Sequence, residues 1–269
     1  MRPLQCTLTL KKFDSPMPIR NSEGSVTVSI VSHGHTSLLP GLIEDLSRCP
    51  EIADIILTRN IPEPDHGRWS QKRLTVLDNT RPKGFGANHN TAFLRVRTPF
   101  FLVLNPDVRL CDNPFPVLMS CMNDEQVGLC APAVVAPHGS LEDSARRFPS
   151  ILGLAMKACG IHDGRLRFSL GDPPRSAPWV AGMFMLVRGK DFSSIGGFDE
   201  GFYLYYEDVD LCTRLWRSGR RVMLCPDACV VHAARRASRH DPRHMRWHAA
   251  SMSRYFLKHA LRPGLPRIP

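Results

Sequence analysis

The chain has 269 residues, of which 43% are hydrophobic and 22% are charged, so it can bury a core in one elaborated α/β domain or two small ones. No apolar run approaches the roughly 18 residues of a membrane-spanning helix, which excludes an integral membrane helix. Residues 1–19 lack the apolar core of a secretory signal, and we expect none. The formal net charge of +10 favours anionic partners: nucleotides, phospholipids or nucleic acid.

The nine cysteines stand singly along the sequence and form no C-x-x-C pair. An odd, unpatterned set in a chain of this size indicates reduced thiols that pack as small apolar residues. We therefore expect a cytoplasmic protein.

The first half of the chain alternates short β-branched runs with apolar residues at helical spacing. Residues 1–24 are expected to form an extension, because Pro16 and Pro18 interrupt its alternating pattern. The predicted elements that follow are a strand over 26–31, a helix over 38–46, strands over 52–58 and 74–77, a helix from Gly84 to Val96 and a strand over 100–104.

The second half is less regular. It is predicted to contain a strand over 184–187, a helix over 209–217, a strand over 221–224 that ends before Pro226, and a basic amphipathic helix from Ala237 to a point before Pro263. Strands that alternate with helices predict an α/β, Rossmann-like fold with a mostly parallel sheet and helices on both faces. Ligands of such sheets bind outside the carboxyl ends of the strands, where residues 32–35 and 105–107 are expected.

Asp107 directly follows the predicted strand over 100–104, after Pro106 has fixed the backbone. A carboxylate at a sheet edge can hold Mg²⁺ or Mn²⁺, which prefer oxygen ligands and are usually shared with substrate phosphates. Asn-Pro-Asp is also common turn chemistry, so an ordinary turn aspartate is the alternative.

Glu207, Asp208 and Asp210 are crowded at the start of the predicted helix over 209–217. Like charges this close repel, which can raise one pKa and favours a general base. The alternative is structural, because acidic residues in a first helical turn stabilise the helix dipole and Asp208 could be the N-cap.

Two further motifs are weaker. Gly84 and Gly86 precede a helix, where backbone N–H groups can approach an anion, although a plain turn is the alternative. His232 ends a short apolar strand, and such a histidine is either a ligand or a hydrogen-bonded structural residue.

Read in chain order, these motifs resemble the family-two glycosyltransferases with the GT-A fold, and particularly their rhamnosyltransferase-like branch. The resemblance covers roughly residues 25–260. The matching segments are Gly84-Phe85-Gly86-Ala87-Asn88-His89-Asn90, Asn105-Pro106-Asp107, Arg147-Phe148-Pro149, Trp179-Val180-Ala181-Gly182, Gly196-Gly197-Phe198-Asp199-Glu200, Glu207-Asp208-Val209-Asp210-Leu211 and Val231-His232.

The resemblance implies a role for each matching residue. Asp107 and His232 would hold the divalent metal, Mg²⁺ or Mn²⁺, and Asp208 would be the catalytic base with Glu207 beside it. The nucleotide and donor sugar are implied to lie against Ser29, Val31, Ser32, Arg59, Asp78, Gly84, Gly86, Asn88, Asn90, Asn105 and Gly182. The acceptor side is implied at Trp179, Asp199 and Glu200.

The sequence departs from the family at Arg59. The family usually ends its second strand with an Asp-Asn pair whose aspartate contacts the base, and this chain has Arg59-Asn60 there. Either Arg59 faces the diphosphate, or Asp78 substitutes for the missing carboxylate, or donor binding is impaired.

The resemblance thus implies an inverting, metal-dependent glycosyltransferase. Its implied donor is dTDP-rhamnose, with a UDP-sugar second, and its implied acceptor is a glycan or lipid-linked glycan of surface polysaccharide. We expect an extension (1–24), a GT-A domain (25–235) with a nucleotide-binding half (25–110) and an acceptor half (111–235), and a basic helical tail (236–269). A non-catalytic nucleotide-sugar-binding homologue or, less expected, a nucleic-acid-binding protein is the alternative.

The basic tail combines arginines with Trp247, Tyr255 and Phe256. A basic helix with aromatic residues suits the headgroup region of an anionic bilayer. One hypothesis is therefore peripheral attachment to the inner face of the cytoplasmic membrane through residues 236–262. The alternative is a tail helix packed on its own domain, with its arginines solvated.

Overall fold

The computed structural model describes residues 23–63, 73–161, 163–233 and 241–260, so the extension lies almost wholly outside the described residues. Helices and strands alternate along the first half, as the sequence pattern predicts. In chain order the elements are β1 (Val26–Ser32), α1 (Leu39–Ser47), β2 (Ile52–Arg59), β3 (Leu74–Asp78), α2 (Phe85–Phe93), β4 (Phe100–Leu104), β5 (Val108–Arg109), α3 (Phe115–Met122), β6 (Val127–Val135), β7 (Ala145–Arg146), α4 (Ile151–Ala158), β8 (Arg175–Ser176), β9 (Trp179–Val180), β10 (Phe184–Arg188), α5 (Gly189–Ser194), α6 (Glu207–Arg217), β11 (Arg221–His232) and α7 (Pro242–Ala260).

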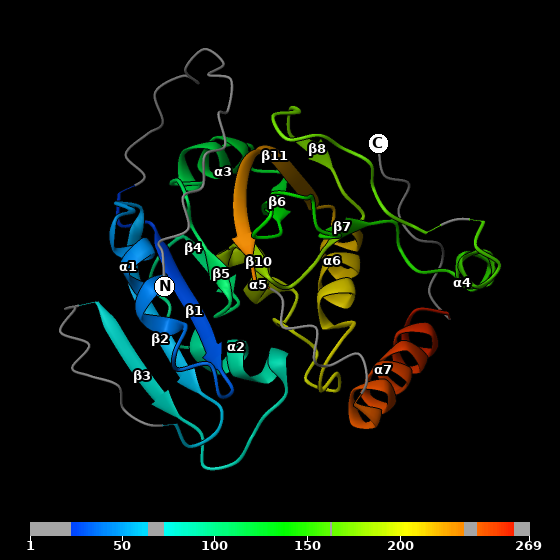
Figure 1. Cartoon of the computed structure of the whole chain (residues 1–269), viewed down its shortest axis with the longest axis horizontal. Coiled ribbons are helices and arrows are strands. Elements are labelled where there is room, and N and C mark those ends of the chain that lie inside the picture. The colour runs from blue at the N-terminus through cyan, green and yellow to red at the C-terminus, as the bar shows by residue number, and fades with distance from the viewer. Residues whose placement is uncertain (1–22, 64–72, 162, 234–240, 261–269) are drawn as a thin grey trace.

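A nine-stranded sheet forms the centre of the molecule, in the order β3-β2-β1-β4-β10-β6-β11-β5, with β8 paired to β11. The pairs β1–β2, β1–β4 and β2–β3 are parallel, and so is β6–β11. Strand β10 runs antiparallel between β4 and β6. The predicted α/β class with a mostly parallel sheet is confirmed (Figure 1).

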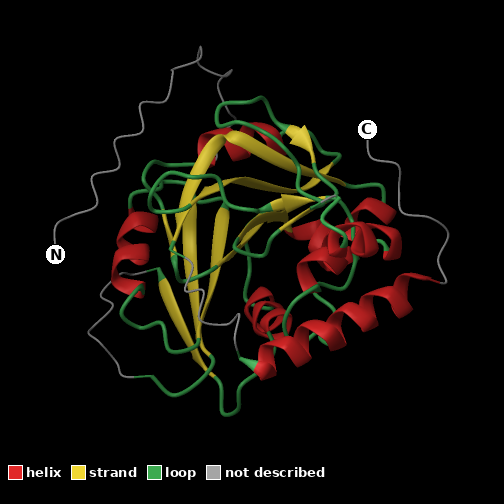
Figure 2. Cartoon of the chain, turned by 45° about the vertical axis from the view of Figure 1, so that its right-hand side comes forward, coloured by secondary structure: helices red, strands yellow, loops and turns green. Residues whose placement is uncertain are grey.

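Helices cover both faces of this sheet (Figure 2). Strands β4 and β6 are buried along their whole length, as expected for apolar runs packed on two sides. One face packs against α1 and α3 through Leu42, Leu46 and Phe115. The other face packs against α5 and α6 through Phe192 and Leu215. The sheet therefore forms a rigid base, and the loops at the carboxyl ends of its strands are free to form a site.

Several elements differ from the sequence prediction, which contained none of β5, β7, β8, β9, α3, α4 and α5. Strand β6 was not predicted, because Gly128 and Pro132 interrupt an otherwise apolar run. Strand β11 does not end before Pro226 but continues to His232. Its register with β6 shifts between Cys225 and Cys229, so the proline falls where the ladder is irregular and its missing N–H costs little. Helix α2 also ends at Phe93 rather than at Val96.

Helix α7 packs against α6 and the loop before it. Tyr255 is buried with Phe202 and Val209. Within α6, Asp210 is fully buried and meets Lys258 Nζ at 2.6 Å and His259 Nε2 at 2.9 Å. This arrangement matches the alternative in which the tail helix packs on its own domain. Among the described residues no helix is both long and apolar enough to cross a membrane.

Candidate active site

A cavity of about 790 Å³ opens beside the start of α6. Its walls come from the 146–150 segment, from α4, from Trp179 and from α7. The residues that line it include Asp208, Glu207, Trp179, Phe148, Leu154, Met156 and His248.

Asp208 lies inside the first turn of α6 and faces this cavity. Its Oδ1 accepts a hydrogen bond from the N–H of Val209 at 2.8 Å, and its Oδ2 accepts one from the N–H of Gly182 at 3.1 Å. The N-cap position is Tyr206, and no side chain caps the helix there. The alternative in which Asp208 is the N-cap is therefore wrong.

The two neighbouring carboxyl groups differ in exposure. Asp208 is partly exposed, whereas Glu207 is only 6% exposed. Burial raises the pKa of Asp208 to about 6, although the N–H groups of Val209 and Gly182 lower it. Burial, and then the charge of Asp208, raise the pKa of Glu207 well above its usual range. The pair thus has one carboxylate poised to accept a proton near neutral pH, which is the property of a general base.

The turn that delivers this pair is strained. Among the described residues Tyr205 and Tyr206 are the only non-glycine residues with positive φ, at 71° and 66°. Such conformations cost about 1–3 kcal/mol each and persist only where surrounding contacts hold them. Helix α7 supplies those contacts: Tyr205 Oη lies 2.8 Å from His244 Nδ1, and the ring of Tyr206 lies 5.4 Å from that of His248.

A second cluster lies where β4 and β11 end. His232 Nε2 is 3.3 Å from Asp107 Oδ2, and His232 Nδ1 is 2.8 Å from Glu142 Oε2. Burial by itself lowers the pKa of His232, but the two carboxylates raise it overall. Pairing of β11 with β5 sets Val108 opposite His232, and this register places Asp107 beside the imidazole.

This cluster suits a divalent cation. Asp107 Oδ1 is buried and has no hydrogen-bond partner in the described part of the chain. Its oxygen and the nearby imidazole nitrogen are donors that Mn²⁺ accepts, and Glu142 would hold the far ring nitrogen, as carboxylates do behind metal-ligating histidines. Glu142 was not predicted, because it follows β6 in a loop without a recognisable motif.

Hydrogen bonds of the backbone connect the segments that carry the two clusters. The N–H of Asn105 donates to the carbonyl of Met183 at 2.9 Å, and the N–H of the adjacent Gly182 donates to Asp208. Asn105 and Gly182 therefore join the loop of Asp107 to the proposed base. Both loops lie at the edge of the sheet that the sequence predicted as the ligand site.

Arg59 and Asp78 meet at the ends of β2 and β3, where they are register partners. Two nitrogens of the Arg59 guanidinium, Nε and a terminal one, donate to the two carboxylate oxygens of Asp78 at 2.5 and 2.8 Å. This bond lowers the pKa of Asp78. Asp78 is thus a carboxylate neutralised by the arginine that replaces the expected aspartate.

The glycines of the 84–90 motif pack closely against a neighbouring segment. A Cβ on Gly84 would lie 2.6 Å from the carbonyl oxygen of Tyr203, and one on Gly86 would lie 2.6 Å from Cβ of Phe198. The N–H of Phe85 donates to Tyr203 O at 2.9 Å. These glycines allow α2 to pack closely against the 198–203 segment.

The side chains of the asparagines in the same motif form hydrogen bonds with other groups of the protein. Asn88 is fully buried and donates to the carbonyl of Gly84 at 3.0 Å, while its Oδ1 accepts from Asn79 at 2.6 Å. Asn90 donates to the carbonyl of Phe198 at 2.9 Å. Both side chains therefore support the frame of the site.

The three residues of β1 that are implied to contact the nucleotide differ in exposure. Ser29 is fully buried, and its hydroxyl lies 2.8 Å from His89 Nδ1. Ser32 is also buried and donates to Glu63 at 2.7 Å. Val31 alone of the three is partly exposed. The nucleotide contacts implied for Ser29 and Ser32 are therefore not available to their side chains in this structure.

Of the three residues implied to contact the acceptor, Trp179 lines the cavity, whereas Asp199 and Glu200 do not. The indole N–H of Trp179 donates to the carbonyl of Arg147 at 2.9 Å. The carboxylate of Asp199 forms an ion pair with Lys258 Nζ of α7, at 2.7 Å. Glu200 accepts a hydrogen bond from Asn90 at 3.0 Å. Asp199 and Glu200 thus support the fold near the site.

Comparison with known proteins agrees with this geometry. The family model described as "Glycosyltransferase like family 2" matches residues 59–250. The rhamnosyltransferase WbbL of Escherichia coli is 30% identical over 252 residues, which cover 87% of this chain and 93% of that protein. An N-acetylglucosaminyl-diphospho-decaprenol L-rhamnosyltransferase of Mycobacterium tuberculosis is 31% identical over 154 residues, which cover 52% of this chain and 49% of that protein.

Solved structures share the fold. GalNAc-T7 with UDP, GalNAc and Mn²⁺ superposes with a TM-score of 0.62 at 15% identity, over 80% of this chain and 45% of that one. The mannosyltransferase PcManGT of Pyrobaculum calidifontis, with GDP-Man and Mn²⁺, gives a TM-score of 0.62 at 16% identity, over 96% of this chain and 69% of that one. Together with the family match, these likenesses show that the chain is a glycosyltransferase of family 2 with the GT-A fold.

Proposed function

We propose that this enzyme transfers rhamnose from dTDP-rhamnose to a hydroxyl of a lipid-linked glycan, with inversion at the anomeric carbon. The observation that carries the chemistry is Asp208, a carboxylate with a pKa near 6 that faces a cavity and is joined through Gly182 to the Asp107 cluster. The names of the two relatives, both rhamnosyltransferases, support the sugar.

In the proposed reaction the acceptor oxygen attacks the anomeric carbon while Asp208 takes the hydroxyl proton. The bond between that carbon and the diphosphate oxygen breaks, and the electron pair leaves with the nucleoside diphosphate. A positioned base contributes about 10²–10⁴-fold to such a step. Asp107 and His232 would hold Mg²⁺ or Mn²⁺, which would neutralise charge on the leaving group.

The apolar side of the cavity supports a lipid-linked acceptor. Phe148, Leu154 and Met156 line it, and Ile151 on the same helix α4 is 76% exposed. The mycobacterial relative is named for an acceptor in which a sugar is joined through diphosphate to decaprenol. A prenyl chain leaving the cavity would find apolar surface here.

Membrane attachment through the tail is the second part of this proposal, on the cytoplasmic face. Tyr255 of α7 is buried, so the aromatic contact with lipid that we hypothesised is not available to it. Arg243 and Arg246 are exposed, and Met245 between them is 65% exposed. Each such cation near an anionic surface is worth about 1 kcal/mol.

A transfer assay tests the function. Wild-type protein, dTDP-rhamnose, Mn²⁺ and a prenyl-diphosphate-linked N-acetylglucosamine should yield a product one deoxyhexose heavier by mass spectrometry. Asp208→Asn should lose this product, and the control Asp54→Asn, at an exposed residue of β2, should keep it. Absence of both transfer and donor hydrolysis in the wild type would support the non-catalytic homologue instead.

Flotation with anionic vesicles tests attachment. Binding should fall with rising salt and be lost in the double variant R243E/R246E, which leaves the packed face of α7 unchanged. The control R95E/R97E changes two exposed arginines elsewhere and should still bind. Equal binding by both double variants would reject attachment through α7.

A further inference from the structure

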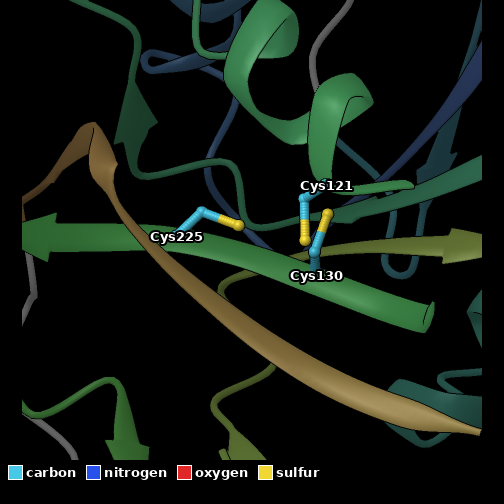
Figure 3. Close-up of side chains that lie close together, drawn as sticks. All are labelled: Cys121, Cys130 and Cys225. Atoms are coloured by element: carbon cyan, nitrogen blue, oxygen red, sulfur yellow. The ribbon is translucent and has the colours of Figure 1, made fainter. Parts of the chain in front are cut away.

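Three cysteines from separate elements converge away from the catalytic cavity. Cys121 lies in the last turn of α3, Cys130 lies in β6 and Cys225 lies in β11. Their three Sγ atoms all lie within 4.8 Å of one another. Figure 3 shows the three side chains pointing toward one another between the helix and the two strands. The proposed reaction uses none of them.

The fold fixes this convergence. Strands β6 and β11 are paired in parallel, with Cys130 opposite Met223 and Cys225 opposite Pro132. Cys130 Sγ also lies 3.6 Å from the carbonyl of Leu118, in the helix above. Cys130 and Cys225 are fully buried, and Cys121 is partly exposed. The cluster is therefore a preformed group of thiols with one side open to solvent.

We propose that Cys121, Cys130 and Cys225 form a binding site for a soft divalent cation, Zn²⁺ in the cell. Thiolates are ligands that select Zn²⁺ over Mg²⁺ or Mn²⁺. With Zn–S bonds of about 2.3 Å, sulfur atoms around one ion are about 3.7–4.0 Å apart. The observed spacing needs a contraction of no more than about 1 Å, which side-chain rotation supplies.

Charge and protonation are compatible with this site. Hydrogen bonds from the thiols of Cys130 and Cys225 lower the pKa of Cys121, and the charge of Arg221 acts in the same direction. Burial raises the pKa of Cys130. On binding, the ion displaces the protons of the thiols into solvent. Affinity should rise with pH as a result.

The bound ion would cross-link α3 to two neighbouring strands. The cysteine site differs from the Asp107 cluster in its ligands, because that cluster offers carboxylate oxygen and imidazole nitrogen. The two sites are thus separable by the choice of ion, with Cd²⁺ as the soft probe and Mg²⁺ as the hard one.

Cadmium titration of the reduced, full-length protein tests the proposal. Ultraviolet thiolate-to-cadmium charge transfer should saturate at a single ion per chain, in excess Mg²⁺, and the melting temperature should rise. Cys130→Ala and Cys121→Ser should reduce the intensity of the band at saturation by about one third and weaken binding at least about tenfold, because one of three thiolate ligands is lost. The control Cys49→Ser, at a buried thiol outside the cluster, should bind like the wild type.

Cys121→Ser lies at a partly exposed position and serves if the buried variant does not fold. Unchanged binding in Cys121→Ser, equal loss in Cys49→Ser, or no charge-transfer band in the reduced wild type would overturn the site. A disulfide between Cys121 and Cys130 in protein purified under reducing conditions, found by thiol counting, would overturn it as well.

Discussion

Replacement of Asp208 by asparagine should separate the catalytic role of this residue from its effect on stability. The amide keeps the shape of the side chain but accepts no proton, so transfer should fall by about 10²-fold or more. Nucleotide-sugar binding should change only a few-fold, because Asp208 acts on the acceptor.

The same change should alter how stability depends on pH. The pKa of Asp208 rises from 3.8 to about 6 in the folded chain, a difference of about two units or about 3 kcal/mol. Because the side chain is partly exposed, we expect solvent screening to reduce this to about 1–2 kcal/mol. A raised carboxyl pKa means that the folded state binds the proton more tightly, so the wild type loses stability as pH rises from about 4 to about 6.

Urea unfolding of both proteins at pH 4 and at pH 7.5 measures the effect. The stability of Asp208→Asn relative to the wild type should increase by about 1–2 kcal/mol between these two pH values, whatever the offset at pH 4. Transfer by the same preparations gives the catalytic loss. A pH-independent difference, or a variant that still transfers sugar, would refute the assignment of Asp208 as a base with a raised pKa.

Three further substitutions address other parts of the structure. Asp107→Ala should remove the stabilisation that Mn²⁺ and a nucleoside diphosphate give together in a thermal-shift assay, and persistence of that stabilisation would reject the metal site. Gly86→Ala, whose Cβ would lie 2.6 Å from Cβ of Phe198, should destabilise the chain by about 1–3 kcal/mol in urea. Asp210→Asn should cost about 3–5 kcal/mol at pH 7, because Lys258 and His259 lose a buried partner. Burial raises the pKa of Asp210 but its cationic partners lower it to about 2, so this cost should shrink as pH falls from about 4 toward 2.

The elements that the sequence predicted well are those with a local pattern. Strands β1, β2 and β4 are short apolar runs, and α1 carries an apolar stripe, so neighbouring residues suffice to identify them. Strand β6 depends on two partner strands that are distant in the chain, and Pro132 opposes a local assignment. Pairing of this kind leaves no periodic signal in a single sequence.

The candidate site also contains residues that a local motif identifies and residues that only distant contacts identify. The motifs around Asp107 and His232 lie at strand ends, and the structure brings these two residues into contact because the ends of parallel strands meet at one edge. Glu142 could not be predicted, since its role depends on a contact with His232 across 90 residues of sequence. Ser29 and Asn88 were assigned to the nucleotide because they belong to the right segments, but only their buried side-chain contacts show that they point inward.

The dependence of the Tyr205–Tyr206 turn on α7 has a consequence for the order in which the protein becomes active during synthesis. A nascent chain that has emerged as far as β11 already contains Asp107, His232, Asp208 and all the strands found among the described residues. It lacks His244 and His248, which hold the left-handed turn before α6. Without them the turn relaxes to a less costly backbone and displaces the first residues of α6. We therefore expect Asp208 to reach the position required for its proposed role as base only after α7 has docked.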